Sequence, residues 1–116
     1  MSLWRSSAIS ELPSWLSFKV NQSLGYYGLW NMLQAELSSP DCPQDRQVFL
    51  DALGKYCVWY TSKYEKRPDM MAAFCYGFAE HLSSDDYNLF STFVTPRVQE
   101  ILRMCIDSAE EQRRKK

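Results

Sequence analysis

Apolar residues recur every three or four positions along most of this chain, in segments that prolines separate. Side chains at this spacing lie on one face of an α-helix. A proline fits the first turn of a helix, where no backbone partner exists for an amide hydrogen. Four prolines stand where such segments begin: Pro13, Pro43, Pro68 and Pro96. The pattern therefore predicts an all-α fold, a compact bundle of about five to six helices.

The positions of the prolines and of the apolar segments between them give the expected helices. Their approximate ranges are residues 1–12, 13–24, 26–37, 44–66, 70–82, 87–93 and 96–109, the first being short and the least regular. Residues 38–43, with the sequence SSPDCP, are the clearest loop. Gly25 is expected to cap the second helix at its C-terminus. The chain after Ala109 has no apolar residue, so residues 113–116 are expected to form a frayed basic tail.

A length of 116 residues is typical of one domain, here assigned to residues 1–112. The hydrophobic fraction of 46% is close to that of globular proteins, which argues against disorder. The formal charge of −1 gives no overall attraction for nucleic acid or for an anionic membrane. No apolar stretch approaches the roughly 20 residues of a membrane-spanning helix.

The cysteines do not form a metal-binding motif. Cys42, Cys57, Cys75 and Cys105 are widely spaced, and His81 is the single histidine, so no metal is expected. The last three cysteines lie among apolar residues of expected helices and are predicted to be buried, reduced thiols. Reduced thiols without a secretory signal predict an intracellular protein of the cytosol or nucleus.

Catalysis would need a base, and His81 is the only candidate of the usual kind. Its neighbours Ser83, Ser84, Asp85 and Asp86 stand at an expected helix boundary, where their ordinary role is capping. The glycines never cluster into a phosphate-binding loop. These observations predict a protein that is not an enzyme and needs no cofactor.

Aromatic residues make up 15% of the chain, which is its one unusual feature of composition. Large rings anchor many protein interfaces, and helical bundles commonly act through their surfaces. The leading hypothesis is an adaptor or assembly module that binds another protein or a second copy of itself. Each candidate ring has packing in the core as its more common alternative. The partner-binding candidates are Trp4, Trp15, Trp30, Trp59 and Tyr60.

Nucleic-acid binding is the alternative hypothesis. Basic residues interleave with rings on the long central helix, and others follow near the C-terminus. Glu65, Glu110 and Glu111 interrupt these groups, and the overall basic charge of such proteins is missing. The cations that would contact phosphate are Lys55, Lys63, Lys66, Arg67, Arg113 and Arg114.

Overall fold

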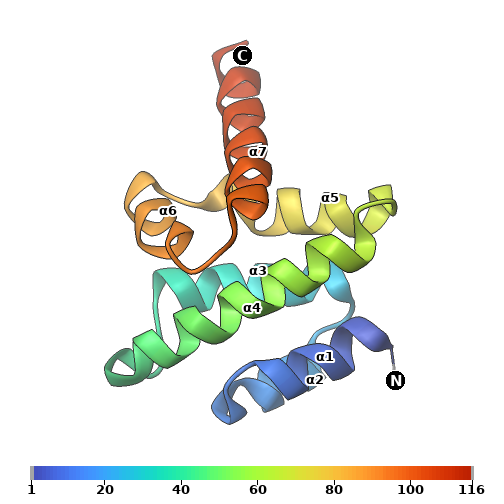
Figure 1. Ribbon diagram of the computed structural model, residues 1–116, viewed down its shortest axis with the longest axis vertical. Helices are drawn as coiled ribbons and strands as arrows, with labels where there is room; N and C mark the ends of the chain where they lie inside the picture. Colours follow the sequence, from blue (N-terminus) through green and yellow to red (C-terminus); the bar gives the residue numbers. More distant parts are fainter. Residues whose placement is uncertain (1, 116) are drawn as a thin grey trace.

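The computed structural model describes residues 2–115, which form seven α-helices, three short 3₁₀ helices and no strand (Figure 1). The α-helices are α1 (Leu3–Glu11), α2 (Ser17–Gln22), α3 (Tyr26–Ser38), α4 (Arg46–Tyr64), α5 (Pro68–Gly77), α6 (Ser84–Ser91) and α7 (Pro96–Arg114). The 3₁₀ helices are η1 (Ser14–Leu16), η2 (Pro43–Asp45) and η3 (Ala79–His81). The all-α prediction is confirmed. The expected number of five to six helices is slightly too low. Each of the seven ranges expected from the sequence overlaps one α-helix of the structure, and the bounds differ.

The helices pack in tiers across the molecule (Figure 1). Helices α3 and α4 cross its middle, α1 and α2 cover one side of them, and α5 and α6 cover the other. Helix α7 begins beside α5 and α6, stands roughly perpendicular to the tiers and runs away from α3 and α4, so that its C-terminal half projects beyond the rest of the protein. The molecule consequently measures 41 × 31 × 26 Å.

Trp30 of α3 is the centre of the core. It is fully buried, and four aromatic rings surround it at centroid distances of 4.8–5.5 Å. These rings come from α4, from α5 and from the residue that follows α5: Tyr56, Tyr60, Phe74 and Phe78. Edge-to-face and tilted pairs of this kind add to the free energy that burial itself contributes.

The hydroxyls of two fully buried tyrosines donate to backbone carbonyls. Tyr56 Oη donates to Trp4 O at 2.8 Å, and Tyr60 Oη donates to Met70 O at 2.7 Å. Burial raises the pKa of both phenols well above the usual value, so the hydroxyls stay protonated as donors. Two hydrogen bonds within the core thus join α4 to α1 and to α5.

Gly25 does not have the predicted capping role. It has an extended backbone, with φ 169°, and stands immediately before α3. The C-terminus of α2 is instead capped by the guanidinium of Arg5, which donates to Val20 O at 2.8 Å and to Ser23 O at 2.7 Å. This cap comes from another helix, so spacing along the chain could not reveal it.

The helix expected over residues 70–82 is broken in the structure. Helix α5 ends at Gly77, and Phe78 leaves the helical conformation before η3. Gly77 packs tightly against α3, since a Cβ at this position would lie 3.3 Å from Trp30 Cβ. Phe78 turns into the core, where its ring also meets Phe90 of α6. Burial of this ring outweighs continuation of the helix.

Helix α7 is longer than expected. It continues to Arg114, so Arg113 and Arg114 belong to a helix and not to a frayed tail, while Lys116 lies outside the described residues. Thr95 Oγ1 accepts from the amide of Val98 at its N-terminus, as N-cap residues do. Within residues 2–115, no helix combines the length and the apolar character needed to cross a bilayer.

The prediction of reduced thiols is wrong for two cysteines. Cys75 of α5 and Cys105 of α7 form a disulfide with a Cα–Cα distance of 5.6 Å, and both are partly exposed. Cys57 is a free, fully buried thiol as expected, and Cys42 is also free. Helical periodicity could place each cysteine on an inner face but not opposite a particular partner. Because disulfides are rare in reducing compartments, the expectation of a cytosolic or nuclear protein loses its main support.

Removal of the disulfide should lower stability without changing the fold. We expect Cys75→Ser with Cys105→Ser to lose about 3 kcal/mol of unfolding free energy, because a cross-link across some 30 residues restricts the unfolded chain. Urea unfolding followed by circular dichroism measures this difference. Cys42→Ser, which removes a free thiol, is the control. Equal unfolding midpoints for all three proteins would contradict the expectation.

Gly54 of α4 should not tolerate a side chain. A Cβ at this position would lie 2.2 Å from the carbonyl oxygen of Phe93, which belongs to the backbone and cannot rotate away. We expect Gly54→Ala to cost about 1–3 kcal/mol through overpacking.

Gly28→Ala is the matched control, since apart from the local backbone of α3 and the two neighbouring residues no atom lies within 4 Å of its Cβ position. The added methyl should stabilise the helix by up to about 1 kcal/mol. Thermal unfolding of both variants gives the comparison, and similar shifts at the two positions would show that the contact between Gly54 and Phe93 is absent.

Candidate functional site: a groove beside helix α7

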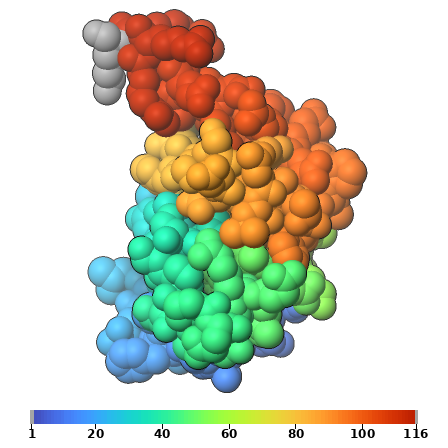
Figure 2. Space-filling model, turned by 90° about the vertical axis from the view of Figure 1, so that its left-hand side faces the viewer, coloured from blue at the N-terminus to red at the C-terminus, as the bar shows by residue number. Residues whose placement is uncertain are grey.

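A groove of about 530 Å³ runs between the C-terminal half of α7 and the segment that joins η3 to α6. Its volume exceeds those of three other surface depressions, which are about 450, 220 and 200 Å³. Figure 2 shows α7 overhanging the neighbouring segment on this side of the molecule. The groove is therefore the first candidate for a binding site.

The floor of the groove is apolar and its rim is charged. Leu82, Ile106 and Ala109 line it and are 7–8% exposed. The rim carries six polar side chains, namely two carboxylates, an imidazole, a guanidinium, a hydroxyl and an amide: Glu80, Glu110, His81, Arg113, Ser83 and Gln112. An apolar floor with a polar rim is the usual composition of a protein-binding surface.

The two walls arise from different local structures. On α7, Ile106, Ala109 and Arg113 share one helical face because they are spaced by three, four and seven residues. On the other wall, η3 ends at His81 and Leu82 is extended, which brings the chain across to the N-cap of α6. The break after Gly77 is therefore what creates this wall.

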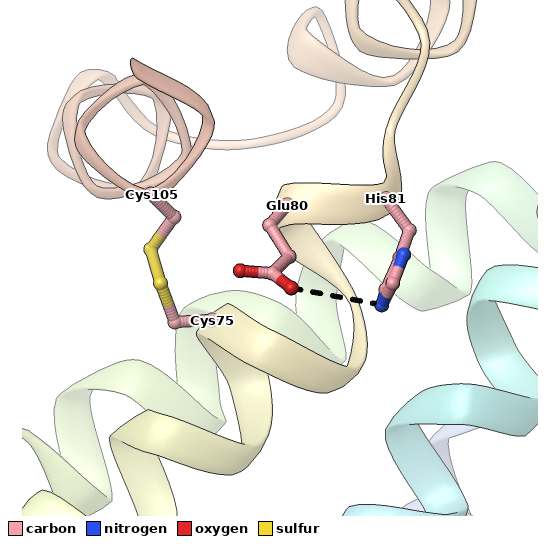
Figure 3. The surroundings of a disulfide bond; sticks show 4 residues. All are labelled: Cys75, Glu80, His81 and Cys105. Atoms are coloured by element: carbon pink, nitrogen blue, oxygen red, sulfur yellow. Dashed lines mark ion pairs between the residues drawn. A yellow bond between two sulfur atoms is a disulfide. The ribbon is translucent and has the colours of Figure 1, made fainter. Parts of the chain in front are cut away.

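The disulfide fixes the relative position of the two walls. Cys105 precedes Ile106 on α7, and Cys75 lies near the end of α5, from which η3 follows directly. Figure 3 shows the disulfide, Glu80 and His81 close to one another at this junction. Glu80 Oε1 lies 3.9 Å from His81 Nε2. The groove is thus held at one end by a covalent bond.

The groups around His81 are not arranged for nucleophilic catalysis. Ser83 Oγ accepts a hydrogen bond from the amide of Asp86 at 3.1 Å, so it acts as the N-cap of α6 as predicted. The His81 side chain is 52% exposed, and its ion-pair partner is the adjacent Glu80. In the part of the chain that the structure describes, no three histidine, cysteine or acidic side chains gather as metal ligands would.

Three of the five predicted partner-binding rings belong to the core. Trp30 and Tyr60 are fully buried, and Trp4 is 9% exposed. These three cannot contact a partner without opening the core, which corrects their assignment as surface anchors. Trp15 and Trp59 are partly exposed. Trp59 lines a second, smaller groove of about 200 Å³ beside Ser7, Ser10, Glu11 and Tyr56.

The basic residues predicted to contact nucleic acid do not form one surface. Lys55 Nζ lies 3.3 Å from Asp51 Oδ2, and Arg67 makes an ion pair with Asp69. Lys63 and Lys66 are exposed near the end of α4, which crosses the body of the protein, whereas Arg113 and Arg114 lie on the projecting end of α7 (Figure 1).

Residue spacing does not predict this groove. Leu82 and Ala109 are the last apolar residues of two predicted helices, and the sequence pattern assigns His81, Ser83 and Arg113 to other roles. Their proximity depends on the break after Gly77 and on the packing of α7. Neither leaves a signal in residue spacing.

Comparisons with protein-family profiles, with curated proteins and with solved structures gave no match to this chain.

The ion pair between Arg67 and Asp69 should be visible in a pH titration. Arg67 Nε and Nη2 donate to the two carboxylate oxygens at 3.0 and 2.7 Å, and these bonds lower the pKa of Asp69 from 3.8 to about 2. We expect Arg67→Gln to return this pKa towards 3.8. Carboxyl carbon NMR shifts across the acid range measure it, with Lys66→Gln as the control.

The sign of the effect on stability follows from the lowered pKa. The ionised carboxylate is favoured in the folded protein, so the pair contributes stability above about pH 4 and loses it as the pH falls through about 2. An equal pKa of Asp69 in the wild type and in Arg67→Gln would show that the ion pair does not form in solution.

Proposed function

We propose that this chain is a non-enzymatic protein-interaction or assembly module whose main binding surface is the α7 groove. The observation that carries this proposal is the apolar floor of Leu82, Ile106 and Ala109 between charged rims, beside a helix end that projects from the body. Such a groove fits an amphipathic helix, which buries an apolar face on the floor and pairs its charges with the rim.

The α7 groove is a better candidate than the aromatic surface that composition favoured. The groove beside Trp59 has about 200 Å³ against about 530 Å³ for the α7 groove. The Trp59 ring also stacks on Tyr56 and meets Tyr64 edge-on, so much of its surface already serves the fold. Trp59 remains a candidate for an additional contact with the same partner.

Nucleic-acid binding has weaker support. Carboxylates neutralise Lys55 and Arg67, and the rim of the α7 groove contains Glu80 and Glu110 beside Arg113. Proteins that bind phosphate backbones present a continuous basic surface. The mixed charge of the α7 groove favours a partner that also carries both signs.

Ala109→Trp, which fills the α7 groove, tests the proposal. We expect this variant to lose its association with a partner. Sedimentation of the purified protein at increasing concentrations measures self-association, and retention of extract proteins on the immobilised chain measures binding to other proteins. Ser108→Trp, an exposed neighbour outside the groove lining, is the matched control and should behave as the wild type. Circular dichroism verifies that both variants keep their helical content.

Equal retention and sedimentation for the wild type, Ala109→Trp and Ser108→Trp would overturn the proposed binding surface. Retention that disappears after nuclease treatment would instead favour the nucleic-acid hypothesis.

A further inference from the structure

The second half of α7 has few buried contacts with the body of the protein. Of residues 106–115, only Ile106 and Ala109 are buried, and the alanine contributes a single methyl group. The hydrogen bond from Arg113 Nη2 to Glu80 O is long, at 3.5 Å, and exposed. Because these contacts are small, the position of this half depends strongly on the disulfide that joins α7 to α5.

This disulfide can be reached from solvent. Cys75 and Cys105 are both partly exposed, and the residues next to them, Tyr76 and Met104, have exposed side chains. Figure 3 shows the two sulfur atoms bridging α5 and α7. Exposed disulfides are reduced more readily than buried structural ones, because a thiolate can approach the sulfur without unfolding the protein.

We propose that the disulfide between Cys75 and Cys105 is a redox switch that controls the α7 groove. This inference rests on the proposed function and concerns the regulation of the same site. In the oxidised chain the cross-link holds the two walls in position, and the groove binds its partner. In the reduced chain the second half of α7 separates from Leu82 and η3, so the groove opens and the partner binds less tightly.

The reductant of the switch is a dithiol. One of its thiolates attacks a sulfur of the disulfide, forms a mixed disulfide and releases the other cysteine as a thiolate, which takes up a proton. The second thiolate of the reductant then attacks the mixed disulfide, closes a disulfide within the reductant and releases the remaining cysteine, which is also protonated. Two electrons and two protons thus pass from the dithiol to the protein, which ends with two free thiols.

Reduction should loosen the end of α7 without unfolding the domain. Val98 and Leu102 are buried in the first half of the helix, and Thr95 caps its N-terminus. These contacts precede Cys105 and do not depend on the cross-link. Local opening costs least free energy where few apolar side chains are buried. The motion is therefore expected in residues 106–114.

A purely structural disulfide is the alternative account. Such a bond restricts the unfolded chain and is reduced only when the whole domain unfolds. The rate of its reduction would change with the global stability of the protein. The rate of attack on the folded protein would not, so the two accounts differ in a measurable way.

The kinetics of reduction by dithiothreitol distinguish them. The parent protein carries Cys42→Ser, which removes the partly exposed free thiol and prevents its exchange with the disulfide. The rate is followed at urea concentrations below the unfolding transition. We expect it to change by less than about twofold per molar urea. Reduction through global unfolding would accelerate by about tenfold per molar, because the unfolded population rises exponentially with urea.

Amide hydrogen exchange measures the release of α7 and requires no partner. After reduction, the amides of residues 106–110 should exchange at least about tenfold faster, while those of residues 98–102 keep their protection. Adding Cys75→Ser and Cys105→Ser to the parent should reproduce the reduced state. Dithiothreitol should change nothing in this serine variant, which makes it the matched control.

Retention of extract proteins on the immobilised chain measures the effect on binding. The relevant fraction is the one that Ala109→Trp abolishes and Ser108→Trp leaves intact. We expect the serine variant to retain at least about threefold less of this fraction than the oxidised parent does, with no reductant present in either sample.

A rate of reduction that rises steeply with urea, or equal exchange of residues 106–110 in the two redox states, would refute the switch and leave the proposed function standing. Equal retention by the oxidised parent and the serine variant would do the same, provided that Ala109→Trp still lowers retention. If Ala109→Trp has no effect on retention, the proposed function fails, and redox control of binding fails with it even where α7 is released.

Discussion

Burial of the Trp30 indole between α4 and α5 is the interaction on which the remaining structure depends. Helix α3 brings this ring against Tyr56 and Tyr60 on one side and against Phe74 and Phe78 on the other. Phe78 can reach it only because α5 stops at Gly77. The break in turn directs η3 and Leu82 along α7, so the shape of the candidate site follows from how one tryptophan is packed.

The core also explains why the abundant rings are poor indicators of function. Trp30, Tyr56 and Tyr60 are fully buried, and their hydroxyls and edges are used to join helices. Composition suggested an aromatic surface, yet the larger groove has an aliphatic floor and a charged rim. A small all-helical domain with short helices needs large side chains to fill the space between them, because few residues of each helix face inward.

Helix α7 joins the core to the surface of interest. Its first half packs through Val98 and Leu102, the disulfide at Cys105 anchors it to α5, and its second half leaves the body. The disulfide lies between the buried first half of α7 and its exposed second half. It holds α7 against α5, so the two walls of the groove keep their relative position while the helix end stays exposed. A helix end that is already folded loses little conformational entropy when it binds, which suits the proposed role in association.

The fold class, most helix starts and the inward-facing stripe of α7 can be predicted from the sequence, because they depend on spacing, prolines and capping residues within one segment. The tertiary structure decided which rings are core, where α5 breaks, that Cys75 meets Cys105 and that Leu82 faces Ile106. Those features arise between segments distant along the chain. Helical periodicity reports which face of a helix is apolar, but it carries no information about the element that covers that face.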